Sequence, residues 1–267
     1  MTILAFPDWI TIPPASITGG AWSPSLPLAN LQDQHLKKVA RSTNTLATST
    51  KFVVDLGSPR PVRVVALLGH NISRSGEVRV RAYADAGLTA LLYDTGVQGA
   101  WPGSFSDYEV MVYPHHWIRP ITETAARWWQ VEIADTGNPA GYVELGRCWL
   151  GSAFEPATPI VYGASLGYES ADEVNEDVGD IDWVVIRTPR RRAVITFPEL
   201  TVEEKRAALI MQKVLGKHAE LLFVMDSNQD AEDMLLQAFP AKVRAASPLS
   251  YPRYNAVEMP LELKEIV

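Results

Sequence analysis

The sequence predicts a mainly β protein, with an antiparallel β-sandwich over residues 1–152 followed by a smaller α+β domain over residues 153–267. Three observations lead to this prediction. Short β-branched or alternating runs recur through the first half and are separated by turn residues, without helical periodicity between them. The segment 151–159 (GSAFEPATP) is rich in small residues and proline, which is typical of a domain boundary. Beyond that segment, helical patterns alternate with further strand-like runs.

Five runs in the first half have the length and composition of strands. They are 51–56 (KFVVDL), 62–68 (VRVVALL), 77–84 (EVRVRAYA), 127–134 (RWWQVEIA) and 142–150 (YVELGRCWL). Gly57 opens a Gly-Ser-Pro turn after the first run. In the third run, Val78 and Val80 alternate with Arg79 and Arg81, as expected for a strand with one buried face. We therefore expect one antiparallel sandwich with little helix.

The second half combines strands with two helices. Strands are expected at 160–168, 183–187, 192–197, 220–225, 241–245 and 256–263. Thr201 and Glu204 have the spacing of a capping box, which begins a helix that Gly216 ends. The residues with the spacing of one buried face on this helix are Ala207, Ile210, Met211, Val214 and Leu215. A second, short helix has on one side Ala231, Met234, Leu235 and Ala238.

Composition excludes several classes of protein. A hydrophobic content of 47% and a charged content of 21% are those of a folded domain, and no run approaches the ~20 apolar residues that span a bilayer. The first residues, MTILAFPDWITIPP, have no basic start and are interrupted by proline and aspartate, so no signal peptide is expected. Cys148 is the single cysteine, which excludes an internal disulfide and a multi-cysteine metal site. We expect synthesis in a reducing cytoplasm.

The negative charge is concentrated in one segment. The net charge is −7, and residues 169–182 contain seven carboxylates and no base. The rest of the chain is balanced, so neither nucleic acid nor membrane insertion is expected. The acidic segment also departs from the spacing of a calcium-binding loop and lacks its glycine.

One aromatic cluster has the composition of a binding site. Its members are Trp101, Tyr113, His115, His116 and Trp117. Aromatic rings stack on sugars and imidazoles bind their hydroxyl groups, so we regard this cluster as a candidate carbohydrate contact. The alternative is that the aromatic rings pack over the end of the sandwich. Adjacent histidines on an extended chain point to opposite sides, which makes a poor metal pair. With no nucleophile motif, no phosphate-binding loop and no metal set, the sequence predicts no catalytic residue, no cofactor and no enzyme.

The acidic segment is followed closely by arginines. Pro189 is expected to place Arg190 to Arg192 at a hairpin tip. Exposed ion pairs contribute only ~0–1 kcal/mol, so such a polarised hairpin has little use in a monomer. We regard as a candidate subunit interface Glu169, Asp172, Glu173, Glu176, Asp177, Arg187, Arg190, Arg191 and Arg192. The alternative is that the two clusters neutralise each other within one hairpin.

Two resemblances follow from these motifs. The FVVDLG, PVRV, VRVRAYAD, RWWQV and YVEL segments resemble strands of galactose-binding-like (discoidin-like) jelly rolls, over residues 15–152. This resemblance implies a fold that includes both carbohydrate-binding modules and structural modules. The succession TGGAW, PLANLQD, ARSTN, FVVDLG and ALLGHN is similar to tail proteins of long-tailed bacteriophages of Gram-negative bacteria. It implies a virion tail or tail-tip subunit.

The function that these observations favour is a non-enzymatic structural subunit of a phage tail tip. It would assemble as a symmetric ring with other copies of itself and contact neighbouring tail proteins. Residues 156–267 are expected to form the larger interface. The alternative is a carbohydrate-binding or receptor-recognition module that uses the aromatic cluster. A hydrolase is disfavoured, because no acid/base pair stands at a useful spacing.

Overall fold

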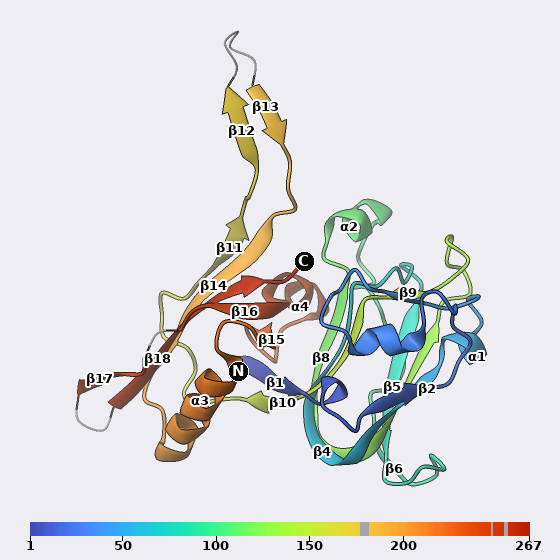
Figure 1. Ribbon diagram of the computed structural model, residues 1–267, viewed down its shortest axis with the longest axis horizontal. Coiled ribbons are helices and arrows are strands. Elements are labelled where there is room, and N and C mark those ends of the chain that lie inside the picture. Colours follow the sequence, from blue (N-terminus) through green and yellow to red (C-terminus); the bar gives the residue numbers. More distant parts are fainter. Residues whose placement is uncertain (177–181, 247, 254–255) are drawn as a thin grey trace. The chain divides into compact units, whose positions relative to one another are not determined.

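The computed structural model describes residues 1–176, 182–246, 248–253 and 256–267 (Figure 1). The chain forms two compact units, each built from separate stretches. We call residues 5–153 and 227–238 the sandwich unit, and residues 1–4, 154–226 and 239–267 the α+β unit. No helix in the described part of the chain is long and apolar enough to cross a membrane.

The division of the chain differs from two consecutive domains at two places. Residues 1–4 belong to the α+β unit, where the Thr2 hydroxyl donates to the Met225 carbonyl at 2.7 Å and the Met1 ammonium pairs with Asp226. Residues 227–238 belong to the sandwich unit, where Leu235 joins the hydrophobic core. Sequence patterns cannot show these exchanges, because each depends on contacts between residues far apart in the chain.

The sandwich unit is made of antiparallel strands with short helices. Its strands are β2 (Ser16–Thr18), β3 (Ala40–Arg41), β4 (Phe52–Leu68), β5 (Glu77–Tyr83), β6 (Leu91–Asp94), β7 (Gln98–Gly99), β8 (His116–Ala134), β9 (Glu144–Leu145) and β10 (Arg147–Phe154). Its helices are η1 (Trp9–Thr11), η2 (Leu28–Gln32), α1 (Ala47–Thr50), α2 (Asp107–Val112) and α4 (Ala231–Gln237). The main order is β10-β4-β8-β5-β6, with β2 beside β4, β7 beside β5, and β3 paired with β9. The strand β1 (Ile3–Asp8) begins in the α+β unit and ends in the sandwich unit.

The sandwich has two layers. The two long strands, β4 and β8, bend together, so that one half of each strand belongs to each layer (Figure 1). Residues 52–55 of β4 pair with residues 128–131 of β8, which also pairs with β5. Residues 64–68 pair with residues 116–120 of β8 and with β10. The register shifts between these two parts of the pairing. The strands predicted at 51–56 and 62–68 are therefore one bent strand, because residues 57–61 continue the pairing with β8 through an irregularity.

Asp55 holds the bend in β4. Its carboxylate accepts from the Gly57 amide at 2.7 Å and from the Arg127 guanidinium at 2.7 and 2.9 Å. The hydrogen bonds from Arg127 lower the pKa of Asp55. Gly57 has a φ of +76°, and a Cβ there would lie 2.4 Å from Pro14 Cγ, so this position requires glycine.

One core joins the two layers. The first layer contributes buried residues that include Phe52, Val54, Val78, Val80, Trp129 and Val131. The second layer contributes residues that include Val65, Leu67, Trp117, Cys148 and Leu150. Because both sets belong to one cluster, the layers face each other as a sandwich. The predicted fold class, mainly antiparallel β with an N-terminal sandwich and a smaller α+β part, is confirmed.

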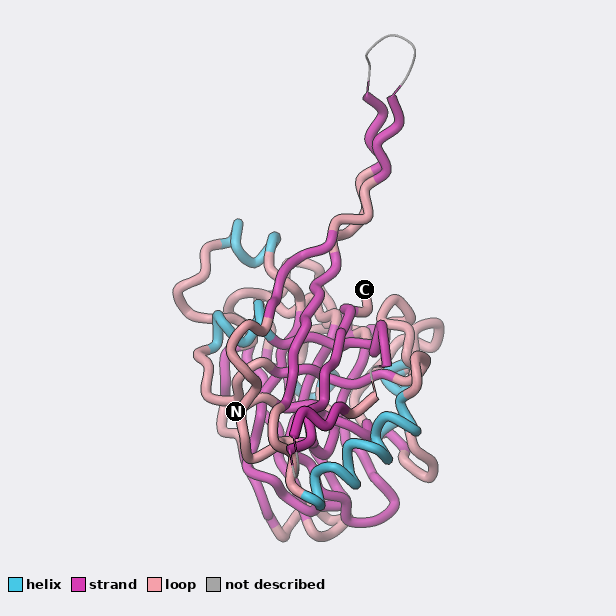
Figure 2. The backbone as a smooth tube through the Cα atoms, turned by 90° about the vertical axis from the view of Figure 1, so that its left-hand side faces the viewer, coloured by secondary structure: helices cyan, strands magenta, loops and turns pink. Residues whose placement is uncertain are grey.

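The α+β unit consists of a sheet, a helix and a projecting ribbon. Its strands are β11 (Ser165–Glu169), β12 (Glu173–Glu176), β13 (Asp182–Val185), β14 (Arg190–Phe197), β15 (Glu220–Val224), β16 (Ala238–Ala246), β17 (Ser250–Arg253) and β18 (Ala256–Glu265). The sheet order is β11-β14-β18-β16-β15, with β17 beside β18. Among the strands of the described residues, β12 and β13 pair only with each other, and they point away from the sheet that carries them (Figure 2).

The helix α3 (Val202–Leu215) begins at the predicted capping box, where Thr201 and Glu204 bond reciprocally. Its buried face, however, differs from the predicted one. The buried residues are Ala208, Met211 and Leu215, whereas Ile210 is 64% exposed and Val214 is 49% exposed. Ala207 is exposed as well. The helix is apolar on two adjacent sides, and packing buries only one of them.

Candidate functional site

A pocket of about 720 Å³ opens among three loops of the sandwich unit. The loop between β4 and β5 supplies residues 71–75, and the loop between β7 and β8 supplies Gly103, Asp107, Val110 and His115. Gly137 and Pro139, from the loop after β8, complete the lining. Binding residues often lie on loops that a rigid scaffold holds in place, and this pocket has that construction.

Buried polar contacts fix two of these loops to each other. Asp135 is buried and accepts from the Ser73 amide and from the Asn138 side chain, both at 2.8 Å. The Asn138 side chain also donates to the Asn71 carbonyl at 3.0 Å. The Asn71 side chain accepts from the Glu144 amide at 2.7 Å. Because these groups are satisfied by one another, this wall of the pocket is held in one conformation.

Two charged side chains of the pocket keep access to solvent. Arg74 and Asp107 lie 3.8 Å apart, and their side chains are 49% and 95% exposed. Asp107 begins α2, which starts with a capping box between Ser106 and Glu109. The Ser106 hydroxyl and amide lower the pKa of Glu109. A pair this exposed contributes little to stability, so both groups remain available to a ligand.

His115 presents a hydrogen-bond acceptor. Its Nδ1 lies 2.9 Å from the His70 carbonyl oxygen, so the neutral ring carries its proton on Nδ1 and Nε2 holds the free lone pair. The ring packs edge-on against Trp101, with 5.1 Å between centroids. His70 is buried behind it, and desolvation, followed by repulsion from His115 and His116, lowers the pKa of His70 well below its usual range.

Of the predicted aromatic cluster, His115 alone lines this pocket. Trp101 and Trp117 are core residues, 4% and 0% exposed, and the Trp101 indole donates to the Ile72 carbonyl at 2.8 Å. His116 is buried and its Nδ1 accepts from the Gly69 amide. Tyr113 packs against Phe105, and its hydroxyl donates to Glu232 at 3.4 Å.

Burial therefore removes both indole faces from contact with a ligand at the surface. The sugar contact itself stays a prediction, now centred on His115. Arg74, Ser75 and Asp107 were missed by the sequence reasoning. The signals available for them were the polar SRSG loop between two strands and the Ser106–Glu109 capping box.

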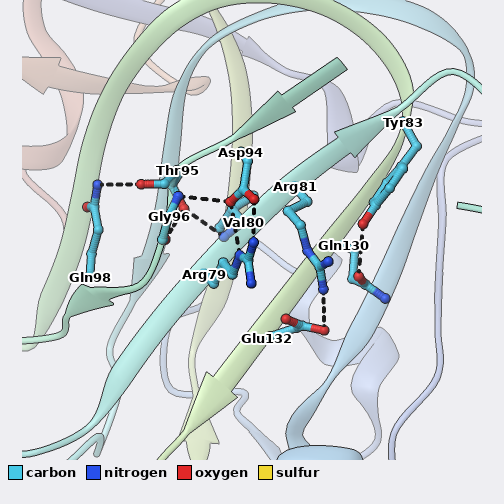
Figure 3. A network of polar contacts seen from close by, with 10 residues as sticks. All are labelled: Arg79, Val80, Arg81, Tyr83, Asp94, Thr95, Gly96, Gln98, Gln130 and Glu132. Atoms are coloured by element: carbon cyan, nitrogen blue, oxygen red, sulfur yellow. Dashed lines mark hydrogen bonds and ion pairs between the residues drawn. The ribbon is translucent and has the colours of Figure 1, made fainter. Parts of the chain in front are cut away.

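A second polar cluster covers the outer side of β5 and β8 (Figure 3). The Arg79 guanidinium binds Asp94 at 3.0 and 2.5 Å, which lowers the pKa of Asp94, and Arg81 pairs with Glu132 at 2.6 Å. The Tyr83 hydroxyl lies 3.5 Å from the Gln130 oxygen. A smaller pocket of about 240 Å³ adjoins Arg79 and Glu132. Since each of these guanidinium groups has a carboxylate partner, this cluster stabilises the sheet and is the weaker candidate for a binding site.

The predicted interface residues are dispersed over the α+β unit. Arg190, Arg191 and Arg192 do not lie at a hairpin tip, because they belong to β14, which pairs with β11 and β18. Arg191 is 1% exposed and pairs with Glu265, so it belongs to the interior of this unit. Arg192 pairs with Glu262 at 2.9 Å.

Most of the acidic residues of the predicted interface have partners within the unit. Glu169 binds Lys264 at 2.9 Å, and Glu173 binds Arg187 at 2.5 Å. The Asp172 carboxylate accepts from the Arg187 amide at 2.7 Å. Glu176 ends β12, and Asp177 lies outside the described residues. The pairs that Arg187 makes with Asp172 and Glu173 agree with the alternative, in which the acidic and basic clusters neutralise each other within one hairpin. The subunit interface itself stays a prediction.

Within the described ranges, no group of three or more His, Cys, Asp or Glu residues is placed to hold a metal ion. Cys148 is fully buried, and burial raises the pKa of its thiol, so it is held in the unreactive protonated form.

No family model matches the chain, and no curated protein matches it. Solved structures with partial likeness include a GH29 fucosidase from Ruminococcus gnavus, with 14% identity, a TM-score of 0.42, and coverage of 56% of this chain and 27% of the fucosidase. A family 32 carbohydrate-binding module of Clostridium perfringens NanJ, in complex with galactose, has 11% identity, a TM-score of 0.39, and coverage of 57% and 100%. A Streptococcus pneumoniae fucose-binding module has 14% identity, a TM-score of 0.39, and coverage of 54% and 94%.

The chain thus spans about a quarter of the length of the fucosidase, which includes far more than the shared part. At these identities and TM-scores, we draw no conclusion from the likenesses about what this chain binds.

Proposed function

We propose that the chain is a non-catalytic binding protein whose sandwich unit takes a carbohydrate in the loop pocket. The observation that carries this proposal is the pocket of about 720 Å³, whose accessible polar side chains include both donors and acceptors. Sugars carry many hydroxyl groups, each of which donates and accepts, so a site for them needs both kinds of partner at short range.

The side chains of the pocket supply these partners. Arg74 offers donors only, Asp107 offers acceptors only, and Ser75 offers both. His115 adds the Nε2 acceptor. Val110 gives the wall an apolar component that suits the C–H faces of a sugar ring. Asp107 is the one carboxylate among the described residues that line this pocket, so the lining favours binding over hydrolysis, which commonly uses two carboxylates.

Binding should be tested with the full chain on a glycan array, followed by titration calorimetry with the best glycan. We expect Arg74→Ala and Asp107→Ala to weaken binding at least about tenfold, which corresponds to about 1.4 kcal/mol. Lys37→Ala, which removes an exposed charge elsewhere in the sandwich unit, is the matched control and should bind normally. The bound glycan should be recovered intact, as judged by mass. Absence of any glycan binding, or binding that is indifferent to both pocket variants, would contradict the proposal.

A second candidate function is an assembly role, as a structural subunit of a phage tail at or near its tip. The sequence resemblance to tail proteins suggests the setting. The specific observation that favours assembly is a group of exposed large apolar side chains on the projecting ribbon, which include Trp183, Val185 and Ile186. In that setting the partners would be further copies in a ring and neighbouring tail proteins, and the location would be the virion.

The tail assignment is tested by labelling purified virions with antibodies against the chain. Label at the distal tail in electron micrographs is the expected result, and virions that lack the chain would exclude the assignment.

A further inference from the structure

The ribbon of the α+β unit has an unpartnered apolar surface. By the apolar ribbon we mean residues 173–176 and 182–186, which comprise β12, β13 and Ile186. Trp183, Val184, Val185 and Ile186 are 65%, 51%, 49% and 83% exposed. Successive side chains of a strand point to opposite faces, so β13 presents apolar side chains on both of its faces. A two-stranded ribbon on its own is at best marginally stable in water, which indicates that a partner covers it.

The helix α3 of the same unit has a second unpartnered apolar surface. By the α3 face we mean Ala207, Ile210 and Val214, which follow the i, i+3, i+7 spacing of one helix side. These side chains are exposed. The flanking cations, Arg206, Lys213 and Lys217, are exposed as well.

The two surfaces complement each other in charge. Residues 172–186, which include the ribbon strands, contain six acids and no base in the sequence, and Arg187, which follows them, pairs with one of these acids, Glu173. The α3 face is flanked by the three exposed cations and, in the first turn of the helix, by the exposed acid Glu203. Apolar contact at the centre with opposite charges at the rim is the usual composition of a specific protein interface.

The two surfaces lie at opposite ends of the α+β unit, as Figures 1 and 2 both show. They therefore face different neighbours when copies line up. A contact between two different surfaces of identical chains is heterologous, and its repetition gives a closed ring when the rotation between copies allows it.

From these observations we propose that copies of this chain associate head to tail, with the apolar ribbon of one copy seated on the α3 face of the next. The inference rests on the second proposed function, the assembly role, and adds to it the partner and the two surfaces involved. It does not depend on carbohydrate binding. In such an assembly Trp183 and Val185, which lie on the same face of β13, are the anchors, since large apolar side chains at the centre of an interface carry most of its affinity.

The test uses three full-length variants and light scattering coupled to size-exclusion chromatography. Trp183→Ser/Val185→Ser removes the anchors of the ribbon, and Ile210→Glu places a charge on the α3 face. Leu46→Ser alters a side chain of the sandwich unit that is 58% exposed, and serves as the matched control. All four substituted residues are exposed, so circular dichroism should show unchanged folding for all three variants. We expect the wild type and Leu46→Ser to be oligomers, and each of the other two variants to be monomeric.

Mixing the ribbon variant with the helix variant identifies the geometry. The ribbon variant still has an intact α3 face and the helix variant an intact ribbon, so a head-to-tail contact allows one junction and yields a dimer of one copy of each. A ribbon-to-ribbon contact yields no such dimer, and that result would overturn the inference. Oligomers that persist in both variants would also overturn it while leaving an assembly role in place. A wild-type chain that stays monomeric at every concentration up to its solubility limit would overturn both.

Discussion

Trp101 and Trp117 allow a direct test of how buried indoles contribute to the sandwich. Both belong to the core cluster, but they differ in one respect. The Trp101 Nε1 donates to the Ile72 carbonyl at 2.8 Å, whereas the Trp117 Nε1 has no hydrogen-bond partner among the described residues. Replacing each tryptophan by phenylalanine removes the same atoms, so the loss of packing is similar in the two variants and the hydrogen bond dominates the difference.

The size of the difference in unfolding free energy between the two variants depends on whether each indole N–H group is hydrogen-bonded. Trp101→Phe leaves the buried Ile72 carbonyl without this donor, which costs about 1–3 kcal/mol. Trp117→Phe removes a buried N–H that is unsatisfied within the described chain, which recovers about 1–3 kcal/mol. The Arg119 guanidinium lies 5.4 Å from the Trp117 ring centroid. The cation–π contact between them would be weaker by less than about 1 kcal/mol in Trp117→Phe, where a phenyl ring replaces the indole. We therefore expect Trp101→Phe to lower the free energy of unfolding by about 1–6 kcal/mol more than Trp117→Phe.

The assay is urea unfolding followed by far-UV circular dichroism, because fluorescence would report the tryptophans that are being removed. The midpoints of the transitions should be compared at equal slopes, since a two-unit chain need not unfold in a single step. Equal destabilisation by the two variants, or a larger effect of Trp117→Phe, would refute the reasoning.

Three further predictions rest on the same structure. The native Cys148 thiol should resist modification by DTNB and become reactive only on unfolding, because it is buried and its pKa is raised. Rapid modification of the folded chain, with unchanged circular dichroism, would contradict this. The stability that the Asp55–Arg127 pair contributes should be fully present above pH 3.8 and decline as the pH falls through the lowered pKa of Asp55, so the gap in unfolding free energy between wild type and Asp55→Asn should narrow only in acid. If the difference in unfolding free energy between wild type and Asp55→Asn narrowed toward alkaline pH instead, the Asp55–Arg127 pair would not be what stabilises the bend. Arg191→Ala should destabilise the α+β unit by about 3–5 kcal/mol, because it leaves the buried Glu265 carboxylate without the guanidinium, whereas Arg191→Met with Glu265→Leu should cost much less. Equal losses in the single and double variants, measured by thermal unfolding, would argue against this account.

The sequence was most informative where burial alternates along a strand. Val78 and Val80 face the core while Arg79 and Arg81 pair on the outer side of the same strand, and this alternation is visible in the residue types alone. The bend near Gly57 is harder to predict from the sequence, because glycine, serine and proline indicate a turn as readily as an irregular stretch within one strand. Only the pairing with β8 distinguishes the two.

Two other features depend on tertiary packing that no local pattern encodes. The α3 helix is apolar on adjacent sides, and tertiary packing buries Met211 and leaves Ile210 exposed. The aromatic residues near position 115 indicate a binding site in the sequence, but Trp101 and Trp117 are buried in the core. The accessible groups of the loop pocket, Arg74 and Asp107, come from separate loops and are brought together only by the fold.

The exchange of segments between the two units has a consequence for how the protein can be made and divided. The chain passes from one unit to the other four times, and the sandwich unit receives its last segment at residues 227–238. A ribosome must therefore have synthesised nearly the whole chain before Leu235 can enter the sandwich core. A gene cut after residue 152 would yield one piece with an unfilled core and another without the strand residues 1–4. A single cut in the gene therefore cannot separate the two units with all of their segments.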